Sequence, residues 1–229
     1  MTSEFVKRSN KRSRLHVYDI EAKRLIDAFK DYGVPDETMD DLSTPEIFSG
    51  LLDTVYCSEA KINLQEVTRR IWDRNDDWCR QGISIILDGG NEENREKAMH
   101  MLLMRSVIAK APVAGIDARI CPMSSLIARL NDFGQPRYTF IDDICEHSTL
   151  IINDVAPEHK FREACDGREL FDWMLSRRQE KGNVTIFVLT SPSEKFVVAG
   201  ELGRRFERMI KSGHSSRIWR IRIEGGTSS

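Results

Sequence analysis

The residues with the clearest chemical potential follow three short apolar runs of the chain. The run ISIIL ends in Asp88-Gly89-Gly90, TLII ends in Asn153-Asp154, and VTIFVL ends in Thr190-Ser191. Glycines let backbone N–H groups approach a phosphate, and carboxylate and amide oxygens are ligands that Mg²⁺ and Ca²⁺ prefer. The three polar stretches are therefore the places where chemistry is expected, provided that the fold brings them together.

The order of the predicted elements brings them together. Short buried strands alternate with amphipathic helices in the second part of the chain. The strands are expected over 83–87, 118–122, 149–152 and 184–190, and the helices over 94–110, 124–130 and 166–181. This order requires crossover connections and predicts a parallel sheet covered by helices on both faces. Ligands of such sheets bind beyond the carboxyl ends of the strands, where the three polar stretches stand.

Flanking segments complete the predicted layout. Ser124 or Ser125 is expected to cap the helix over 124–130. Residues 200–211 are expected to be helical, and the alternating sequence IWRIRI over 218–223 predicts an edge strand. Ahead of the first core strand, helices are expected over 18–31 and 59–80, with an acidic, turn-rich linker over 33–45. The chain thus divides into a basic flexible arm (1–16), a helical N-terminal segment (17–80) and an α/β core (81–229).

Composition limits the class of protein. The chain has 229 residues, of which 40% are hydrophobic and 31% charged, and a formal net charge of −2. No apolar run approaches the roughly 20 residues of a membrane span, and the N-terminus MTSEFVKRSNKRSR lacks the apolar region of a signal peptide. We therefore expect a cytoplasmic protein with no membrane partner. The five cysteines form no C-x-x-C pair and are expected to be buried thiols, and no metal site is expected.

The order of the motifs resembles a known family. The pieces ISIILDGGNEENREKA, TLIINDV, VTIFVLTSP and ELGRRFERMI follow one another as in the AAA+ ATPase domain of the DnaC/DnaI/IstB helicase-loader family. The lead-in YGVPDETMDDL and the final RIWRIRI extend this resemblance from residue 33 to 223. It implies an AAA+-like α/β fold of the P-loop type. Such a fold has a parallel five-stranded sheet sandwiched by helices, here with a small helical N-terminal extension.

The phosphate loop departs from the family's pattern G-x-x-x-x-G-K-[ST]. Aligned on Gly89 and Gly90, the chain has Asn94 for the second glycine, Arg95 for the lysine and Glu96 for the hydroxyl residue. Carboxylates of Asp88, Glu92, Glu93 and Glu96 would then surround a polyanion and repel it. The sequence therefore predicts no bound cofactor, and ATP with Mg²⁺ only if the degenerate site still binds them.

The other two strand ends are altered as well. Under the resemblance, Asn153 and Asp154 occupy the places of the two Walker B acids, and Ser191 occupies that of the sensor asparagine. Two alternatives stay open: these are loops of an unrelated α/β domain, or DGGNEEN is an acidic loop for Ca²⁺ or Mg²⁺. No catalytic residue is predicted, and the chain is not expected to be an enzyme.

Basic residues suggest two further contacts. Arg204 and Arg208 resemble the family's arginine-finger helix, with a solvated helix face as the alternative. The candidate DNA-binding residues are Lys7, Arg8, Lys11 and Arg12 in the arm and Arg217 and Arg220 near the C-terminus. Clustered lysines and arginines suffice for contact with a phosphate backbone, so single-stranded DNA is a possible partner.

The resemblance implies a DNA-replication accessory protein that binds a replicative helicase through regions ahead of the core, and a phage or mobile-element origin. Leu25, Ile26 and Phe29 are the predicted partner-binding residues, because their helical spacing suits a partner's groove. They could equally cap the core. The alternatives are an active, divergent ATPase loader or IstB-like transposition regulator, and a DNA-binding α/β module. The sequence leaves the oligomeric state open.

Overall fold

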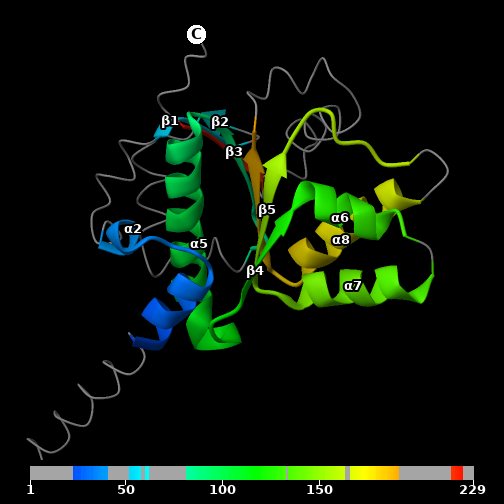
Figure 1. Ribbon diagram of the computed structural model, residues 1–229, viewed down its shortest axis with the longest axis horizontal. Helices are drawn as coiled ribbons and strands as arrows, with labels where there is room; N and C mark the ends of the chain where they lie inside the picture. Colours follow the sequence, from blue (N-terminus) through cyan, green and yellow to red (C-terminus); the bar gives the residue numbers. More distant parts are fainter. Residues whose placement is uncertain are drawn as a thin grey trace, which may run out of the picture.

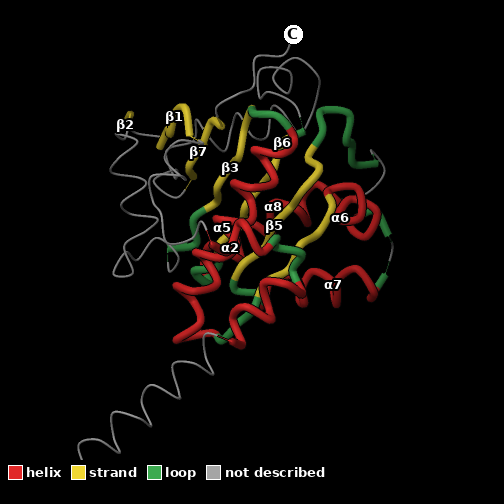
Figure 2. Tube along the Cα trace, turned by 60° about the vertical axis from the view of Figure 1, so that its left-hand side comes forward, coloured by secondary structure: helices red, strands yellow, loops and turns green. Residues whose placement is uncertain are grey.

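The computed structural model describes residues 23–40, 52–57, 60–61, 81–132, 134–162, 166–190 and 218–223. A seven-stranded sheet lies at its centre, in the order β2-β1-β7-β3-β6-β5-β4 (Figure 2). The strands are β1 (Leu52–Cys57), β2 (Ala60–Lys61), β3 (Ser84–Gly89), β4 (Ala118–Pro122), β5 (Thr149–Val155), β6 (Val184–Leu189) and β7 (Ile218–Ile223). The five strands from β7 to β4 are parallel, whereas β1 and β2 are added antiparallel.

Helices cover both faces of the sheet. Figure 1 shows α2 (Asp36–Asp40) and α5 (Glu92–Ala114) on one side, and α6 (Met123–Leu130), α7 (Gln135–Glu146) and α8 (Gly167–Glu180) on the other. Residues 23–31 are also helical and pack on the α5 side. Among the described helices, none is long and apolar enough to cross a bilayer.

Strand periodicity explains the two hydrophobic cores. Alternate residues of a strand point to opposite faces, so Ile85 and Leu87 join the core under α5, whereas Ile86 joins the core under α6, α7 and α8. The central strands β3 and β6 are buried along their length, as parallel strands covered on both faces should be. Cys121 and Cys145 are buried free thiols, as expected for these two cysteines.

The predicted α/β class and the five parallel strands are confirmed, with several corrections around them. The IWRIRI strand is not at an edge, because β7 lies between β1 and β3. Residues 60–61 begin the segment predicted as a helix over 59–80, yet they pair with β1, so the region ahead of residue 81 contributes strands to the sheet. The predicted linker over 33–45 contains α2, and α7 was not predicted.

Helix α6 begins without the predicted serine cap. Ser124 and Ser125 lie inside the helix, and Pro122 precedes it in an extended conformation with no side-chain capping bond. Pro122 also ends β4, so strand and helix follow each other directly.

A buried arginine joins the end of α7 to the start of β6. Arg178 of α8 is among the largest fully buried side chains of the described residues. Its Nη1 donates hydrogen bonds to the carbonyl oxygens of Ile144 at 2.5 Å and His147 at 2.8 Å. Its Nη2 donates to the carbonyl oxygen of Val184 at 2.6 Å, and its Nε donates to Thr185 Oγ1 at 2.9 Å. One planar guanidinium thus holds two elements together.

The charge of Arg178 is stabilised mainly by backbone dipoles. Burial lowers the pKa of Arg178 to about 10, and the side chain therefore stays charged at neutral pH. The carbonyl oxygens at the C-terminal end of α7 carry the negative end of the helix dipole and lack partners within the helix. The guanidinium thus supplies donors to the carbonyl oxygens at the helix end, and their negative partial charge stabilises the cation.

We expect Arg178→Met to destabilise the fold strongly. The substitution removes the Arg178 donors from three carbonyl oxygens, and each such loss at a buried group costs about 1–3 kcal/mol. Urea denaturation should show a fall of at least about 3 kcal/mol in the free energy of unfolding. Arg178→Lys keeps the charge but cannot reach both elements, so an intermediate loss is expected.

Arg177→Met is the matched control. Arg177 neighbours Arg178 on α8, but its ion pair with Asp142 lies at the surface, where such pairs contribute little. Its unfolding midpoint should stay near that of the wild type. Equal losses for the variants at 177 and 178 would contradict the anchoring role of Arg178.

His100 makes the fold sensitive to acid. This side chain of α5 is only 4% exposed, and burial lowers the pKa of His100 below 6.5, opposed by the charge of Glu96. The folded state therefore holds His100 neutral, whereas the unfolded chain takes up a proton below about pH 6.5. Stability from this group is present above the unfolded pKa and is lost as the pH falls toward the folded pKa.

We expect His100→Gln to flatten the dependence of stability on pH between about pH 7 and 5. One proton contributes a slope of at most about 1.4 kcal/mol per pH unit, and the variant should lose part of the wild-type slope in this window. Urea denaturation at several pH values measures the difference. Parallel curves for the two proteins would show that His100 does not titrate differently in the folded and unfolded states.

Candidate functional site

The carboxyl ends of the parallel strands form the candidate site. Because β6 lies between β3 and β5, the ends of all three strands stand side by side at one edge of the sheet. The ends of β3 and β5 are two strand spacings apart, or about 10 Å. The predicted residues Gly89, Gly90, Asn153 and Asp154 all belong to this edge, as the sequence indicated.

The turn after β3 is much shorter than a phosphate loop. Helix α5 begins at Glu92, directly after Gly90 and Asn91. Most of the aligned phosphate-loop motif is therefore helical. Asn91 Oδ1 accepts a hydrogen bond from the backbone N–H of Asn94 at 2.8 Å, as a helix N-cap does. The exposed carboxylates of Glu92 and Glu93 stand in the first turn, where they favour the helix dipole.

Arg95 closes this turn from within. Its Nη1 donates to the carbonyl oxygen of Gly90 at 2.7 Å and lies 3.5 Å from that of Gly89. The residue that stands in place of the phosphate-loop lysine thus binds the backbone of its own turn. Glu96, the other altered position, is exposed on α5.

The glycines of the turn are required by its geometry. Gly89 and Gly90 have φ values of +83° and +67°, a region that disfavours other residues. A Cβ atom on Gly90 would lie 2.9 Å from Ile223 Cγ2, so the end of β7 packs directly against the turn. These glycines serve a tight strand-to-helix turn with a side chain already beside it.

The carboxylate of Asp88 does not face this edge as a free charge. Asp88 is buried, and its Oδ2 accepts hydrogen bonds from Arg220 of β7, from Nε at 2.8 Å and from Nη2. The expectation that Asp88 helps to repel a phosphate is therefore wrong, because Arg220 compensates its charge. Arg220 was a predicted DNA-binding residue, and its DNA contact stays a prediction. In the fold it neutralises Asp88.

The end of β5 carries a bulge. Register with β6 shifts between Ile152 and Val155, and Asp154 has a φ of +54°. Asn153 Nδ2 donates to Asp154 Oδ2 at 3.1 Å, and Asp154 is exposed. Beyond the bulge, Thr190 donates from its N and Oγ1 to the carbonyl oxygen of Val155, at 2.9 and 3.2 Å. Bulges of this kind re-aim side chains at the edge of a sheet.

Asn153 Oδ1 is buried and has no hydrogen-bond partner among the described residues. Among the buried side-chain atoms that the described chain leaves without a partner, it is the one at this edge. No group of three or more His, Cys, Asp or Glu side chains that could hold a metal ion occurs in the described ranges.

Several predicted site residues lie outside the described residues. These are Lys7, Arg8, Lys11, Arg12, Ser191, Arg204, Arg208 and Arg217. Their predicted contacts with DNA, or with a nucleotide, remain predictions. Thr190, which precedes Ser191, is the last residue of the described range 166–190.

The predicted partner-binding residues divide between core and surface. Phe29 is 3% exposed and belongs to the core under α5, and Leu25 packs against that core. Ile26 keeps 46% of its surface exposed. The alternative that this helix caps the core therefore holds for Phe29 and Leu25, and Ile26 is the residue of the three that a partner can reach.

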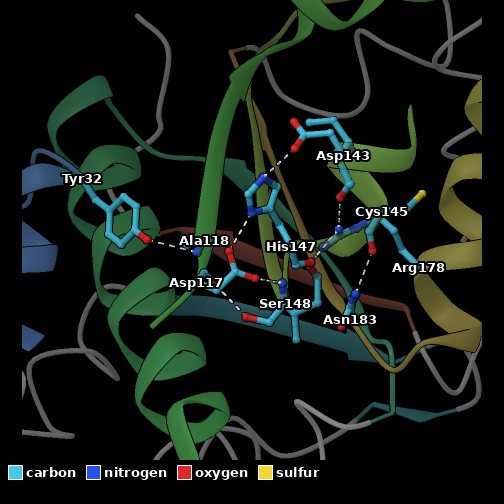
Figure 3. Close-up of polar contacts among 11 residues, drawn as sticks. Tyr32, Asp117, Ala118, Asp143, Cys145, His147, Ser148, Arg178 and Asn183 are labelled. Carbon is cyan, nitrogen blue, oxygen red and sulfur yellow. Dashed lines mark hydrogen bonds and ion pairs between the residues drawn. The ribbon is translucent and has the colours of Figure 1, made fainter. Parts of the chain in front are cut away.

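A second polar cluster occupies the opposite, amino edge of the sheet (Figure 3). Asp117 Oδ1 lies 2.6 Å from His147 Nδ1, and its Oδ2 accepts from the backbone N–H of Ser148 at 2.7 Å. Ser148 Oγ donates to the carbonyl oxygen of Asp117 at 2.6 Å, and Ser148 is buried. The hydroxyl is bonded to backbone, not to the imidazole, so the three residues fasten β4 to β5 and form no nucleophilic triad.

Sequence reasoning missed the features that close the carboxyl edge. The cap by Asn91 was detectable, because an asparagine followed by Glu92 and Glu93 is a helix-start pattern. The pair of Asp88 and Arg220 joins residues 132 positions apart and had no local pattern. Ile223 was placed in a strand, but nothing in the sequence put that strand beside the turn.

Comparison with known proteins identifies no family for this chain. No protein-family model matches the chain, and no curated protein matches its sequence.

We expect Gly90→Ala to destabilise the protein through the turn. The new methyl group would overlap with Ile223, and the alanine would have to keep the positive φ of Gly90. Overpacking and backbone strain together should cost about 2–4 kcal/mol. Gly115→Ala is the matched control, because Gly115 has a φ of +74° but no atom within 4 Å of the added Cβ. Its loss should be limited to the strain, about 1 kcal/mol. Thermal unfolding of both variants measures the difference, and equal shifts would contradict the close packing of β7 on the turn.

Proposed function

We propose that the chain is a replication accessory protein of the helicase-loader type that has kept the AAA+-like scaffold and works by binding, without a nucleotide cycle. The observation that carries this proposal is the contrast at the carboxyl edge. The strand order suits a nucleotide site, whereas the turn after β3 is filled by its own chain.

The strand order supports the scaffold part of the proposal. A sensor residue must reach the terminal phosphate from between the phosphate loop and the metal-binding acids. Strand β6 lies between β3 and β5, so it stands where that role requires. The alternative of an unrelated α/β domain predicts no particular role for β6, whereas the proposed scaffold requires this order.

The closed turn supports the loss of nucleotide binding. A phosphate loop binds through free backbone N–H groups and a lysine that reaches the phosphates. Here Asn91 occupies one amide of the turn, and Arg95 donates to the carbonyl oxygen of Gly90. A phosphate could reach the backbone of this turn only if both contacts were broken.

We predict no ATP binding below about millimolar concentration, where a Kd of 1 mM corresponds to about 4 kcal/mol. Calorimetric titration of the full chain with ATP and Mg²⁺ measures this directly. The triple variant Asn94→Gly, Arg95→Lys and Glu96→Thr rebuilds the phosphate-loop pattern and is the positive control, with higher affinity expected. A micromolar Kd for the unaltered chain would favour the alternative of an active, divergent ATPase.

The helicase contact is tested at Ile26. We predict that the full chain co-elutes with the replicative helicase encoded by its own genome or its host's, and that Ile26→Glu weakens this complex. Because Ile26 is exposed, the melting temperature should stay nearly unchanged. Lack of co-elution by the unaltered chain would remove the helicase proposal.

A further inference from the structure

The outer face of α7 and α8 carries exposed aromatic side chains that the proposed function does not use. Tyr138 keeps 38% of its surface exposed and Trp173 keeps 45%. Each ring is accompanied by an arginine. The guanidinium carbon of Arg137 lies 4.9 Å from the centre of the Tyr138 ring, and that of Arg177 lies 5.1 Å from the Trp173 ring. Tryptophan, tyrosine and arginine are the residues that most often carry binding energy at protein interfaces.

The two rings lie next to a ladder of ion pairs that joins α7 to α8. Arg177 pairs with Asp142, and Lys181 pairs with Glu146, in both cases across 35 positions of the chain. Tyr138 and Trp173 come four residues before Asp142 and Arg177, on the same helix faces. The two helices therefore present the aromatic residues together, next to a pair of surface ion bridges.

Ion pairs accompany both arginines of this face. Arg137 Nη1 and Nη2 donate to the two carboxylate oxygens of Asp166 at 2.6 and 2.9 Å. Arg177 lies between Asp142 and the Trp173 ring.

The surplus charge of this face is negative. The acidic residues of α7, α8 and their ends are Asp142, Asp143, Glu146, Asp166, Glu169, Asp172 and Glu180, whereas the basic ones other than the fully buried Arg178 are Arg137, Arg168, Arg177 and Lys181. Exposed aromatic rings beside arginines also suit stacking of nucleic-acid bases. The excess of carboxylates would repel the phosphates of a nucleic acid, and both stacked arginines already bind aspartates.

We propose that the face formed by Tyr138, Trp173 and the surrounding acidic residues docks a basic amphipathic helix of a partner protein. Apolar side chains of that helix would cover the two rings. Its lysines or arginines would meet Glu169 and Glu180, which are exposed on α8 one turn before and two turns after Trp173. The proposal rests on α7 and α8 alone and does not depend on the state of the nucleotide site or on a helicase partner.

A synthetic helical peptide of about 18 residues, with leucines on one face and lysines on the other, is the probe. Fluorescence anisotropy with the full chain should show saturable binding that weakens as salt rises. Trp173→Ala and Tyr138→Ala should each weaken binding by about tenfold or more, and Glu169→Lys should weaken it as well. Glu37→Lys is the matched control for Glu169→Lys, since Glu37 is also exposed but belongs to α2 on the other face of the sheet, and it should leave binding unchanged.

Three results would overturn the proposal. The first is absence of saturable peptide binding at low salt. The second is binding that neither aromatic variant changes. The third is equal or tighter binding at this face of single-stranded DNA, or of the same peptide with glutamates in place of lysines, again judged by its loss in Trp173→Ala.

Discussion

The start of β6 is the point on which the sheet depends, and a buried cation holds it. Strand β6 lies between β3 and β5 and is buried on every described residue, so its position fixes the spacing of the sheet's central strands. Arg178 ties its first residues to the end of α7. On the other face, Lys110 Nζ of α5 donates to the carbonyl oxygen of Gly182 at 2.6 Å, just ahead of the strand. Both helical layers thus fasten the same end of β6, and the ends of β3 and β5 meet beside its other end.

The two edges of the sheet have different chemistry as a consequence. At the amino edge, Asp117, His147 and Ser148 bond to one another and to backbone, which makes that edge a structural joint. At the carboxyl edge, the turn at Gly90 is tight, but the bulge at Asp154 leaves an exposed carboxylate. The outer strand β4 offers little to an added strand. The N–H of Ala118 is bonded to the Tyr32 hydroxyl at 3.1 Å, and Pro122 has no N–H.

Local patterns in the sequence predicted the parts of the fold that depend on local periodicity. The strands at ISIIL and VTIFVL, the α/β alternation and the meeting of strand ends at one edge all follow from apolar runs and short connections. Helix α7 was missed because its apolar residues, such as Ile141 and Ile144, are few and interrupted by acids. The partners of β1 and β7 could not be read, since strand pairing across most of the chain's length leaves no local pattern. The contacts of Arg95 with the carbonyl oxygen of Gly90 and of Asp88 with Arg220 could not be predicted, because neither pairing leaves a pattern in the sequence.

Amide hydrogen exchange reports directly on whether the turn from Gly89 to Asn94 is closed in the free protein. We expect the N–H of Asn94, bonded to Asn91 Oδ1, and that of Arg95, bonded to the carbonyl oxygen of Asn91, to be protected already without any ligand. Adding millimolar ATP with Mg²⁺ should leave that protection unchanged. Rapid exchange of these amides in the free chain, followed by protection when ATP is added, would contradict a closed turn, because that is the behaviour of an open loop that a phosphate orders.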